Sequence, residues 1–315
     1  MSAPRRQESR PRRRQLDGVL LLDKPLGLSS NHALQAARRL YSAEKAGHTG
    51  TLDPLATGLL PLCFGEATKF SGELLNADKR YVATVQLGVT TDTADAEGVV
   101  LERHPVEVGL SDVNAALAAF IGEIEQVPPM YSALKRDGKP LYEYARAGIE
   151  LERSARRIRI HELRLLATGE GESMAGGRFV FEVRCSKGTY VRTLAADIGE
   201  RLGCGAHLAA LRRTGIGALD VVQAHSLATL EALTAEARDA LLLPPDSLLS
   251  NLAEARLDAA DAARLRHGQA VRWAGEEGAR LRVYDAEYAF IGVCRQVADG
   301  WLQAQRLVSG VQATK

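Results

Sequence analysis

The chain has 315 residues, of which 46% are hydrophobic, and a formal net charge of +1. This length suffices for a substantial core and favours two domains over one, and the near-neutral charge excludes a uniformly basic surface for binding nucleic acid. No apolar run approaches the length of a membrane span, and the four cysteines lack the C-x-x-C spacing of a zinc or redox site. Unpaired, widely spaced cysteines suit a reducing cytosol, so we expect a cytoplasmic protein.

The N-terminal segment is the most basic part of the chain. Its first 14 residues hold six arginines and one glutamate, which leaves about −4 for the rest because the total is +1. Any nucleic acid must therefore be bound by local patches on the body. We expect residues 1–15 to be a disordered, solvated arm, with phosphate binding as the alternative interpretation. No hydrophobic stretch follows the arginines, so the arm does not resemble a secretory signal.

The first predicted elements surround a glycine-rich segment. Residues 18–22 are an apolar run bounded by turn formers, which predicts a buried strand. A helix is expected over residues 29–41, capped by Ser29 or Ser30, because its apolar residues recur at helical spacing. Residues 47–60, GHTGTLDPLATGLL, are then interpreted as a loop.

Periodicity predicts the next elements. Residues 79–89 alternate as a strand does, and residues 111–124 have the pattern of a helix starting at Ser111 or Asp112. Residues 128–157 are rich in proline, glycine, tyrosine and charges of both signs, without a sustained period. We expect an exposed insertion there, with one short helix at residues 141–148.

The C-terminal half has clearer signals. Regular alternation returns at residues 157–166, residues 178–186 predict a strand, and residues 189–203 predict a helix that stops at Gly203. A further helix is expected over residues 227–241, and beyond a boundary near Ser250 short alternating segments predict a small β-rich unit. The class is therefore mixed α+β with a small β-rich C-terminal domain.

Asp53 is the one carboxylate of the glycine-rich segment. An Asp-Pro pair is common at turns and helix starts, so Asp53 could serve only as a cap for backbone N–H groups. Catalysis is the other interpretation, because Gly47 and Gly50 permit a tight loop against a ligand and the apolar flank leaves the carboxylate poorly hydrated without a cation. His48 lies on the same segment, where its ring could stack on a ligand.

Arg192 is a candidate for that cation. It lies in the first turn of the helix predicted after Gly188, and its guanidinium could pair with a carboxylate in bidentate fashion. Such a pair would lower the pKa of the acid by about one to three units. On its own, the residue is also compatible with an ordinary surface arginine, and its partner stays open.

Other chemistries find less support in the sequence. Asp92 and Asp95 lack the spacing and final glutamate of an EF-hand loop and are better explained as turn caps. The GHTG segment is not followed by the G-K-[ST] of a phosphate-binding loop, and no G-x-S-x-G nucleophile motif occurs. No metal site is therefore predicted.

Long segments in a fixed order resemble the TruB family of tRNA pseudouridine synthases. The resemblance covers residues 16–249, and the C-terminal unit resembles, more weakly, the family's small RNA-binding domain of the PUA type. The segments that carry it are GVLLLDKPLGLSSN, KAGHTGTLDPLATGLLPLCFGEATKF, KRYVATVQLGVTTDTADAEG, VPPMYSALKRDGKPLYEYARAGIE and CSKGTYVRTLAADIGERLGCGAHLAALRRTGIG.

This resemblance implies a fold and a reaction. The fold is a catalytic domain over residues 16–250 with a mixed, largely antiparallel sheet, flanking helices and a mobile RNA-binding insertion at about 130–157, followed by a PUA-like domain over residues 251–315. The reaction isomerises uridine 55 in the T-loop of tRNA to pseudouridine, breaking the N1–C1′ bond and joining C5 to C1′. It is neither an oxidation nor a reduction, so no cofactor is implied; the expected partner is the tRNA T-arm, and the chain is expected to be a monomer.

The resemblance also implies roles for individual residues. Asp53 is the essential carboxylate, acting as a nucleophile or as a base on the ribose, with Arg192 keeping it negative. His48 fills the space that the flipped base leaves, Tyr81 packs on the uracil, and Tyr190 and Leu211 complete the pocket. Without the resemblance, Tyr81 and Leu211 would be interpreted as ordinary core residues. The candidates for contact with RNA phosphates are basic side chains, namely Lys69, Lys135, Arg136, Lys139, Arg146, Arg212 and Arg213.

Three alternatives remain open at this point. The chain could be a non-catalytic protein that binds tRNA and assists its folding. It could be a related synthase that acts on another RNA, for example within a guide-RNA particle. An aspartate-dependent hydrolase is the third, although the sequence offers no evident second carboxylate or activating base for it.

Overall fold

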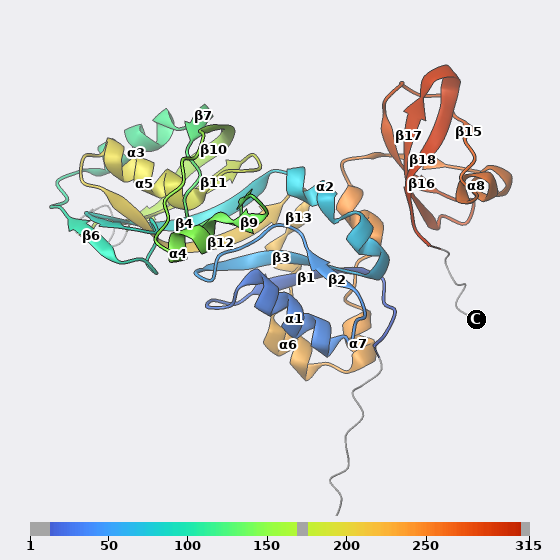
Figure 1. The fold of residues 1–315 in the computed structure, drawn as a ribbon, viewed down its shortest axis with the longest axis horizontal. Coiled ribbons are helices and arrows are strands. Elements are labelled where there is room, and N and C mark those ends of the chain that lie inside the picture. The colour runs from blue at the N-terminus through green and yellow to red at the C-terminus, as the bar shows by residue number, and fades with distance from the viewer. Residues whose placement is uncertain (1–12, 169–175, 310–315) are drawn as a thin grey trace, which may run out of the picture.

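A computed structural model describes residues 13–168 and 176–309 of the chain (Figure 1). Half of the described strands form one nine-stranded sheet, and a separate five-stranded sheet lies to one side of it. The main path of the large sheet is, in spatial order, β1 (Gly18–Lys24), β3 (Ala56–Phe64), β12 (Ala206–Ile216), β4 (Lys79–Leu87), β11 (Arg178–Cys185), β10 (Arg156–Thr168) and β7 (Gly122–Gln126).

Pairing within the large sheet is mostly antiparallel, as the family resemblance implies. Among the pairs along this path, β12 and β3 alone are parallel, with Leu211 beside Ala56. β2 (Ala46–His48) pairs with β3, and β13 (Leu219–Asp220) pairs with β12. Two short hairpins lie outside the sheet: β5 (Val89–Thr91) with β6 (Val100–Arg103), and β8 (Lys135–Arg136) with β9 (Lys139–Pro140).

Helices cover the sheet and bury its apolar side chains. The main core joins apolar residues of the sheet to the inner faces of the helices packed on it, and Leu20, Leu60, Phe179 and Leu194 are fully buried within it. The helices are α1 (Ser30–Leu40), α2 (Ser71–Asn76), α3 (Leu110–Ala119), α4 (Leu141–Arg146), α5 (Val191–Arg201), α6 (Leu227–Ala232), α7 (Ala235–Asp239) and α8 (Ala259–Arg266), with 3-10 turns at Gly65–Lys69, Val221–Gln223, Pro245–Leu249 and Ala298–Gly300. None of the described helices is long and apolar enough to cross a membrane.

Several predicted elements are confirmed. Ser29 caps α1 by accepting a hydrogen bond from the backbone N–H of His32 at 3.2 Å. The predicted helix at residues 189–203 is α5, and Gly203 follows it with φ of +77°, a left-handed conformation that glycine adopts at little cost. The short helix expected in the insertion is α4.

Two strands in the middle of the large sheet, β3 and β12, were not predicted from the sequence. The segment interpreted as one glycine-rich loop, residues 47–60, is a loop only between β2 and β3, and β3 itself is almost wholly buried. Its run of apolar residues has no alternation because both faces of the strand are covered. β12 was also not predicted, since arginines interrupt its apolar pattern.

Two predicted helices have different bounds. The prediction of a helix over residues 111–124 was wrong at both ends: Gly109 is the N-cap, and α3 stops before Gly122, whose φ of +111° starts β7. Asp112 acts from inside the first turn, accepting from the N–H of Gly109 at 2.8 Å. The helix predicted over residues 227–241 is two helices, because Thr234 caps a new one by accepting from Ala237.

The basic arm predicted over residues 1–15 is described only at its end, since residues 1–12 lie outside the described ranges. There the expectation of a solvated arm was wrong. The N–H of Arg14 donates to the carbonyl of Ser42 at 2.7 Å, and its guanidinium pairs with Asp239. These contacts attach the start of the described chain to α7.

The five-stranded sheet forms the C-terminal unit beside α2 (Figure 1). Arg280 donates to both carboxylate oxygens of Glu73 at 2.9 and 2.6 Å, and Phe70 packs edge-on against Phe290 with ring centroids 5.4 Å apart. Tyr284 donates to Asp246 at 2.6 Å. The strands of this unit are, in spatial order, β14 (Ala253–Arg256), β16 (Arg280–Tyr284), β17 (Phe290–Val297), β18 (Trp301–Leu307) and β15 (Val271–Arg272).

Candidate active site

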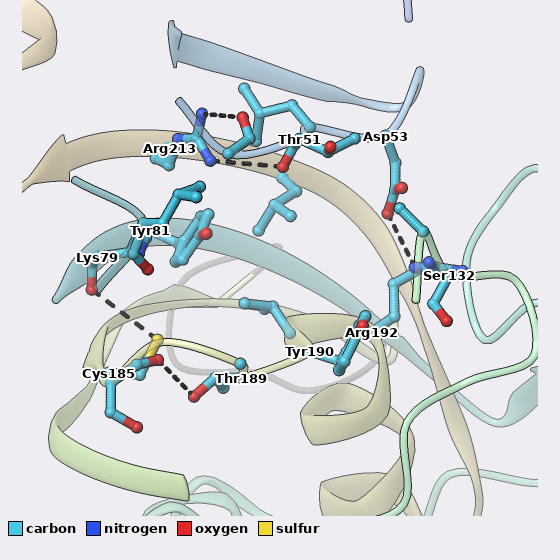
Figure 2. Close-up of a pocket in the computed structure, with 18 residues that line it drawn as sticks. Thr51, Asp53, Lys79, Tyr81, Ser132, Cys185, Thr189, Tyr190, Arg192 and Arg213 are labelled. Carbon is cyan, nitrogen blue, oxygen red and sulfur yellow. Dashed lines mark hydrogen bonds and ion pairs between the residues drawn. The ribbon is translucent and has the colours of Figure 1, made fainter. Parts of the chain in front are cut away.

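A pocket of about 270 Å³ opens beside the middle of the large sheet (Figure 2). Its walls come from segments far apart in the chain: the loop at residues 50–53, strands β4 and β12, residues 185–192 at the start of α5, and Ser132 and Ala133 of the insertion. Six predicted site residues meet there, namely Asp53, Tyr81, Tyr190, Arg192, Leu211 and Arg213.

The guanidinium of Arg192 contacts three separate segments of the chain at this site. Its Nε lies 3.1 Å from Oδ2 of Asp53, so the carboxylate partner that the sequence left open is Asp53. The predicted bidentate geometry is wrong, because the other guanidinium nitrogens have different partners. Nη1 donates to the carbonyl of Thr93 at 3.1 Å and lies 3.5 Å from Oδ2 of Asp95, and Nη2 donates to the carbonyl of Tyr131 at 2.6 Å. A buried arginine thus holds four oxygens from three segments.

The expected effect on the pKa of Asp53 is also corrected. Burial in the pocket raises the pKa of Asp53 above its ordinary value, and the charge of Asp95 raises it further. The guanidinium of Arg192 and the ammonium of Lys24 act in the opposite direction without reversing the shift. Arg192 therefore limits the rise of this pKa, where the sequence analysis expected a net lowering.

The loop that carries Asp53 is fixed from both sides. The hydroxyl of Ser30 accepts from the N–H of Leu52 at 2.7 Å and donates to its carbonyl at 2.9 Å. Lys24 is fully buried, and its ammonium donates to the carbonyls of Pro25 and Leu28 at 2.9 and 2.5 Å and lies 3.5 Å from that of Pro54. Burial lowers the pKa of Lys24 to about 8. Sequence reasoning missed Lys24, because a lysine between a strand and a turn is typical of a solvated residue.

The aromatic residues of the pocket remain neutral at ordinary pH. Burial raises the pKa of Tyr81 and of Tyr190 above the usual value for a phenol. Tyr81 lies across from Arg213 in the β4–β12 register, and Leu211 lies across from Ala83. Figure 2 shows the ring of Tyr81 between Arg213 and Cys185, on the side of the pocket away from Asp53 and Arg192. The two aromatic rings offer faces of the kind on which a base can stack.

His48 lies at the end of β2, outside the pocket lining. Burial and the nearby charge of Arg213 lower the pKa of His48, so its ring is neutral at physiological pH. Its Nδ1 is buried and has no hydrogen-bond partner among the described residues. The predicted role as a wedge beside the site stays a prediction.

Three of the seven predicted phosphate contacts have partners within the protein, and one of the three, Arg213, is buried. Arg213 is 1% exposed and donates to the carbonyls of Leu59, Thr51 and Gly50 at 2.8, 3.5 and 3.3 Å, which fixes the loop before Asp53. A guanidinium buried in this way cannot reach an RNA backbone.

Arg212 and Lys69 are held by other partners. Arg212 forms a bidentate pair with Asp23 at 2.9 and 2.7 Å, so its charge is neutralised locally. The ammonium of Lys69 pairs with Glu66 at 2.6 Å and donates to the carbonyl of Leu307 at 3.0 Å, which binds it to the end of β18.

The other four cations belong to the insertion, on the β8–β9 hairpin and α4. Lys139 lies over the ring of Tyr144, with its ammonium 5.0 Å from the centroid, and Arg146 lies over that of Tyr142 at 5.3 Å. Lys135 and Arg136 are exposed. These four positions stay predicted phosphate contacts.

Three further residues of the site were missed. Asp95 was interpreted as a turn cap, and it does accept from the N–H of Glu97 at 3.1 Å, but its second oxygen faces Arg192. Gln126, which is 2% exposed, holds the residue before α5: its Oε1 accepts from the N–H of Tyr190 at 3.0 Å, and its Nε2 donates to the carbonyl of Tyr190 at 3.3 Å. Ser132 brings a hydroxyl from the insertion into the pocket wall. No local sequence pattern distinguishes these residues from ordinary polar ones.

Metal chemistry has no ready ligand set in the described ranges, where no three His, Cys, Asp or Glu side chains are grouped as metal ligands would be. The four cysteines are free and buried. Asp53 and Arg192 are thus the charged pair that the pocket presents for chemistry, between aromatic and aliphatic walls.

Comparison with known proteins gives consistent matches along the chain. The family model described as TruB family pseudouridylate synthase (N terminal domain) matches residues 38–191. The tRNA pseudouridylate synthase B C-terminal domain model matches residues 192–250, and the model described as Pseudouridine synthase II TruB, C-terminal, matches residues 253–308.

Similar sequences carry the same family name, and a similar solved structure shares the fold. A protein of Burkholderia mallei (strain ATCC 23344) named tRNA pseudouridine synthase B is 60% identical, over 95% of this chain and 97% of its own. The protein of that name from Thiobacillus denitrificans (strain ATCC 25259 / T1) is 56% identical, over 96% of this chain and 100% of its own. A chain in the crystal structure of a Cbf5-Nop10-Gar1 complex is similar in fold, with a TM-score of 0.69 and 24% identity, over 93% of this chain and 84% of that one.

Proposed function

The chain belongs to the TruB family of pseudouridylate synthases, and from this membership we propose that it converts uridine 55 in the T-loop of tRNA to pseudouridine. The relatives named tRNA pseudouridine synthase B match over nearly the whole chain, which supports tRNA as the substrate. The position in the T-loop is the finer part of the proposal, and it follows from the family resemblance of the motifs.

The observation that carries the proposal is the Asp53–Arg192 pair. Its two charged groups lie 3.1 Å apart in a pocket that also presents the ring of Tyr81. A pocket of this kind takes a single base, and a base inside a folded loop reaches it only after leaving its stack, which costs a few kcal/mol. Stacking on an aromatic ring returns about 1–3 kcal/mol per base. Tyr81, with Leu211 and Tyr190 around it, provides that compensation.

Asp53 carries the chemistry in this proposal. Breaking the N1–C1′ bond leaves electron-poor carbon at C1′, which a carboxylate can attack as a nucleophile; alternatively, the carboxylate removes a proton from the ribose. Both routes require an anion. Arg192 favours that anion and also fixes its position, because the guanidinium is itself held by the carbonyls of Thr93 and Tyr131. The uracil then turns over, C5 bonds to C1′, the hydrogen of C5 leaves to water as a proton, and N1 takes up a proton in exchange.

We assign the remaining contacts to RNA binding. Residues 16–250 form the catalytic unit, and residues 251–315 form a PUA-like unit that holds the RNA away from the T-loop. The insertion at about 130–157 closes over the T-loop, bringing its exposed cations, Lys135, Arg136, Lys139 and Arg146, to the phosphates. The proposed assembly is one protein chain with one tRNA.

Release of tritium tests the proposed reaction. RNA carrying tritium at uracil C5 is incubated with the protein, and release to water is measured, because forming the C5–C1′ bond expels that hydrogen. We expect release with the wild type and none with Asp53→Asn, which keeps the size of the side chain and lacks the anion. Glu182→Gln, a carboxylate on the exposed face of β11, is the matched control and is expected to release tritium normally.

The outcome also separates the alternatives. RNA binding without release by the wild type would mean a non-catalytic binder, and substantial release by Asp53→Asn would contradict the role of the carboxylate. Mapping pseudouridine in the product tests the substrate. Modification of the T-loop uridine is expected, and modification elsewhere in an RNA would overturn the assignment to position 55.

A further inference from the structure

Ser132 is the one residue of the pocket lining, among the described residues, whose buried side-chain oxygen makes no hydrogen bond of ordinary length and geometry. Its hydroxyl faces the phenol of Tyr190, another residue of the lining, and acts to lower the pKa of that phenol against the larger effect of burial. It is 5% exposed. Its backbone is held in place: its N–H donates to the carbonyl of Met130 at 2.9 Å, and its carbonyl accepts from the N–H of Tyr142 at 3.1 Å. The hydroxyl is therefore fixed in the wall by the chain on either side of it.

An unpaired buried hydroxyl is costly. Leaving such a group without a partner costs about 1–3 kcal/mol, so buried polar atoms without a partner call for a ligand or another explanation. The other polar side chains of the lining illustrate the contrast. Arg213 and Thr189 donate to backbone carbonyls, and the ammonium of Lys79 donates to three carbonyls at the end of α2.

The location of Ser132 indicates which part of a bound nucleotide it would face. Its neighbour Tyr131 provides the carbonyl that accepts from Nη2 of Arg192 at 2.6 Å, while Nε of the same guanidinium lies 3.1 Å from Asp53. Figure 2 shows Ser132 beside Asp53 and Arg192, at the opposite side of the pocket from Lys79 and Cys185. In the proposed reaction Asp53 faces the sugar, so Ser132 lies on the sugar side of the pocket.

We propose that Ser132 hydrogen-bonds to the 2′-hydroxyl of the target uridine and thereby selects ribose over deoxyribose at that position. This inference rests on the proposed function. A serine hydroxyl both donates and accepts, as does the 2′-hydroxyl, and that group is what distinguishes RNA from DNA at a single nucleotide. The residue thus adds a specificity contact that the sequence analysis did not assign.

Equilibrium binding tests the contact without turnover. Two T-arm stem-loops are compared, one all-ribose and one with 2′-deoxyuridine at the target position only, with Asp53→Asn and with the double variant Asp53→Asn/Ser132→Ala. We expect Asp53→Asn to bind the all-ribose RNA about three- to tenfold more tightly, the range for one net hydrogen bond. The Ser132→Ala change should remove this preference and leave affinity for the deoxy RNA unchanged, which also reports that the pocket is intact.

Two results would overturn the inference. An equal loss of affinity for both RNAs would place the hydroxyl on the base or a phosphate, and an unchanged preference would leave it without a contact to the sugar. Ser186→Ala in the same background is the control, because its oxygen already accepts from the N–H of Arg159 at 2.8 Å and should not affect the preference. Tritium release by the wild type is measured separately, so failure of this contact is distinguishable from failure of the proposed function.

Discussion

Arg192 connects three segments of the chain at a single guanidinium. Asp53 comes from the loop before β3, Thr93 and Asp95 from the turn between β5 and β6, and Tyr131 from the insertion. Because each contact uses a planar, fixed donor, movement of any one segment disturbs the direction in which the guanidinium meets Asp53. The position of the Asp53 carboxylate is therefore tied to the position of the insertion.

The raised pKa of Asp53 has a consequence for the pH dependence of turnover. The proposed reaction needs ionised Asp53, so activity should be lost as the pH falls through its pKa. Because burial and Asp95 raise that pKa, the acid limb of kcat/KM should lie above the pH at which an ordinary aspartate titrates. Asp95→Asn removes a negative charge that raises the pKa, so the limb should move to lower pH.

Tritium-release rates across a pH series measure this shift. Asp92→Asn is the matched control, because Asp92 lies on the same turn but caps the N–H of Val99 at 2.7 Å and has no contact with Arg192. A limb that moves to higher pH in Asp95→Asn would contradict the electrostatic explanation.

Tyr81 tests the stacking part of the site. Tyr81→Phe keeps the ring and should bind the T-arm stem-loop within about twofold of the wild type, because stacking needs only the aromatic face. Tyr81→Ala removes the ring and should weaken binding by about five- to 150-fold, corresponding to 1–3 kcal/mol. Filter binding measures both variants, and a large loss of affinity in Tyr81→Phe would refute stacking as the main contribution.

For single residues, the sequence was better at identifying which side chains belong to the site than at predicting what each of them contacts. The pair of Asp53 and Arg192 was anticipated, but Asp95 was not, since its role depends on a turn folding back against α5. Arg213 looked like a surface cation, because an arginine in an arginine pair is usually exposed. Its burial follows from the crossing of β12 over the loop before β3, a long-range contact that local sequence does not encode.

At the scale of elements, Gln126 joins the last strand of the sheet to the helix that carries Arg192. Its two hydrogen bonds to the backbone of Tyr190 hold the N-terminus of α5 against the end of β7. Gln126→Leu leaves the N–H of Tyr190 without this partner, which should cost about 1–3 kcal/mol of stability. Turnover should fall as well, because Arg192 is two residues further along the chain.

Thermal unfolding and kcat/KM measure the two effects together. Gln35→Leu, on the exposed side of α1 with only a 3.5 Å contact to Asn31, is the control and should change neither. Loss of stability without loss of turnover would mean that Gln126 supports the fold but does not position the site.

Elements with a clear period were predictable, and elements buried on both sides were not. α1 and α5 repeat apolar residues at helical spacing, and β4 alternates, because each of them packs one face on the core and leaves the other less completely buried. β3 has no such alternation, since its neighbours are β1, β2 and β12 and both of its faces are covered. Its glycine and proline, Gly58 and Pro61, suggested a loop in the absence of those neighbours.

At the scale of the whole molecule, the C-terminal unit is attached through α2. Apolar contact between Phe70 and Phe290 provides much of this attachment, and the bidentate Glu73–Arg280 pair fixes its direction. Partly exposed ion pairs contribute about 0–1 kcal/mol, so the pair should affect orientation more than stability. Arg280→Ala should therefore raise KM for whole tRNA about two- to fivefold and leave KM for the isolated T-arm stem-loop unchanged.

The double variant Glu73→Arg/Arg280→Glu keeps the ion pair with its charges exchanged, so it should restore KM for whole tRNA. Restoration would show that the effect of Arg280→Ala comes from loss of this pair. Steady-state kinetics with both substrates measures the effect. A rise in KM for the stem-loop equal to that for whole tRNA would show that the pair acts on α2 and the pocket, whose lining includes Leu75, and not on the placement of the C-terminal unit.

The position of β12 has a consequence for the order in which the protein is made. β12 lies between β3 and β4, which leave the ribosome more than a hundred residues earlier. Until Ala206–Ile216 emerge, both of those strands have an unpaired edge, and unpaired edges favour association between nascent chains. The same strand carries Leu211 and Arg213, which line the pocket. Pairing of β12 with β3 and β4 therefore completes the large sheet and the lining of the pocket at the same late stage of synthesis.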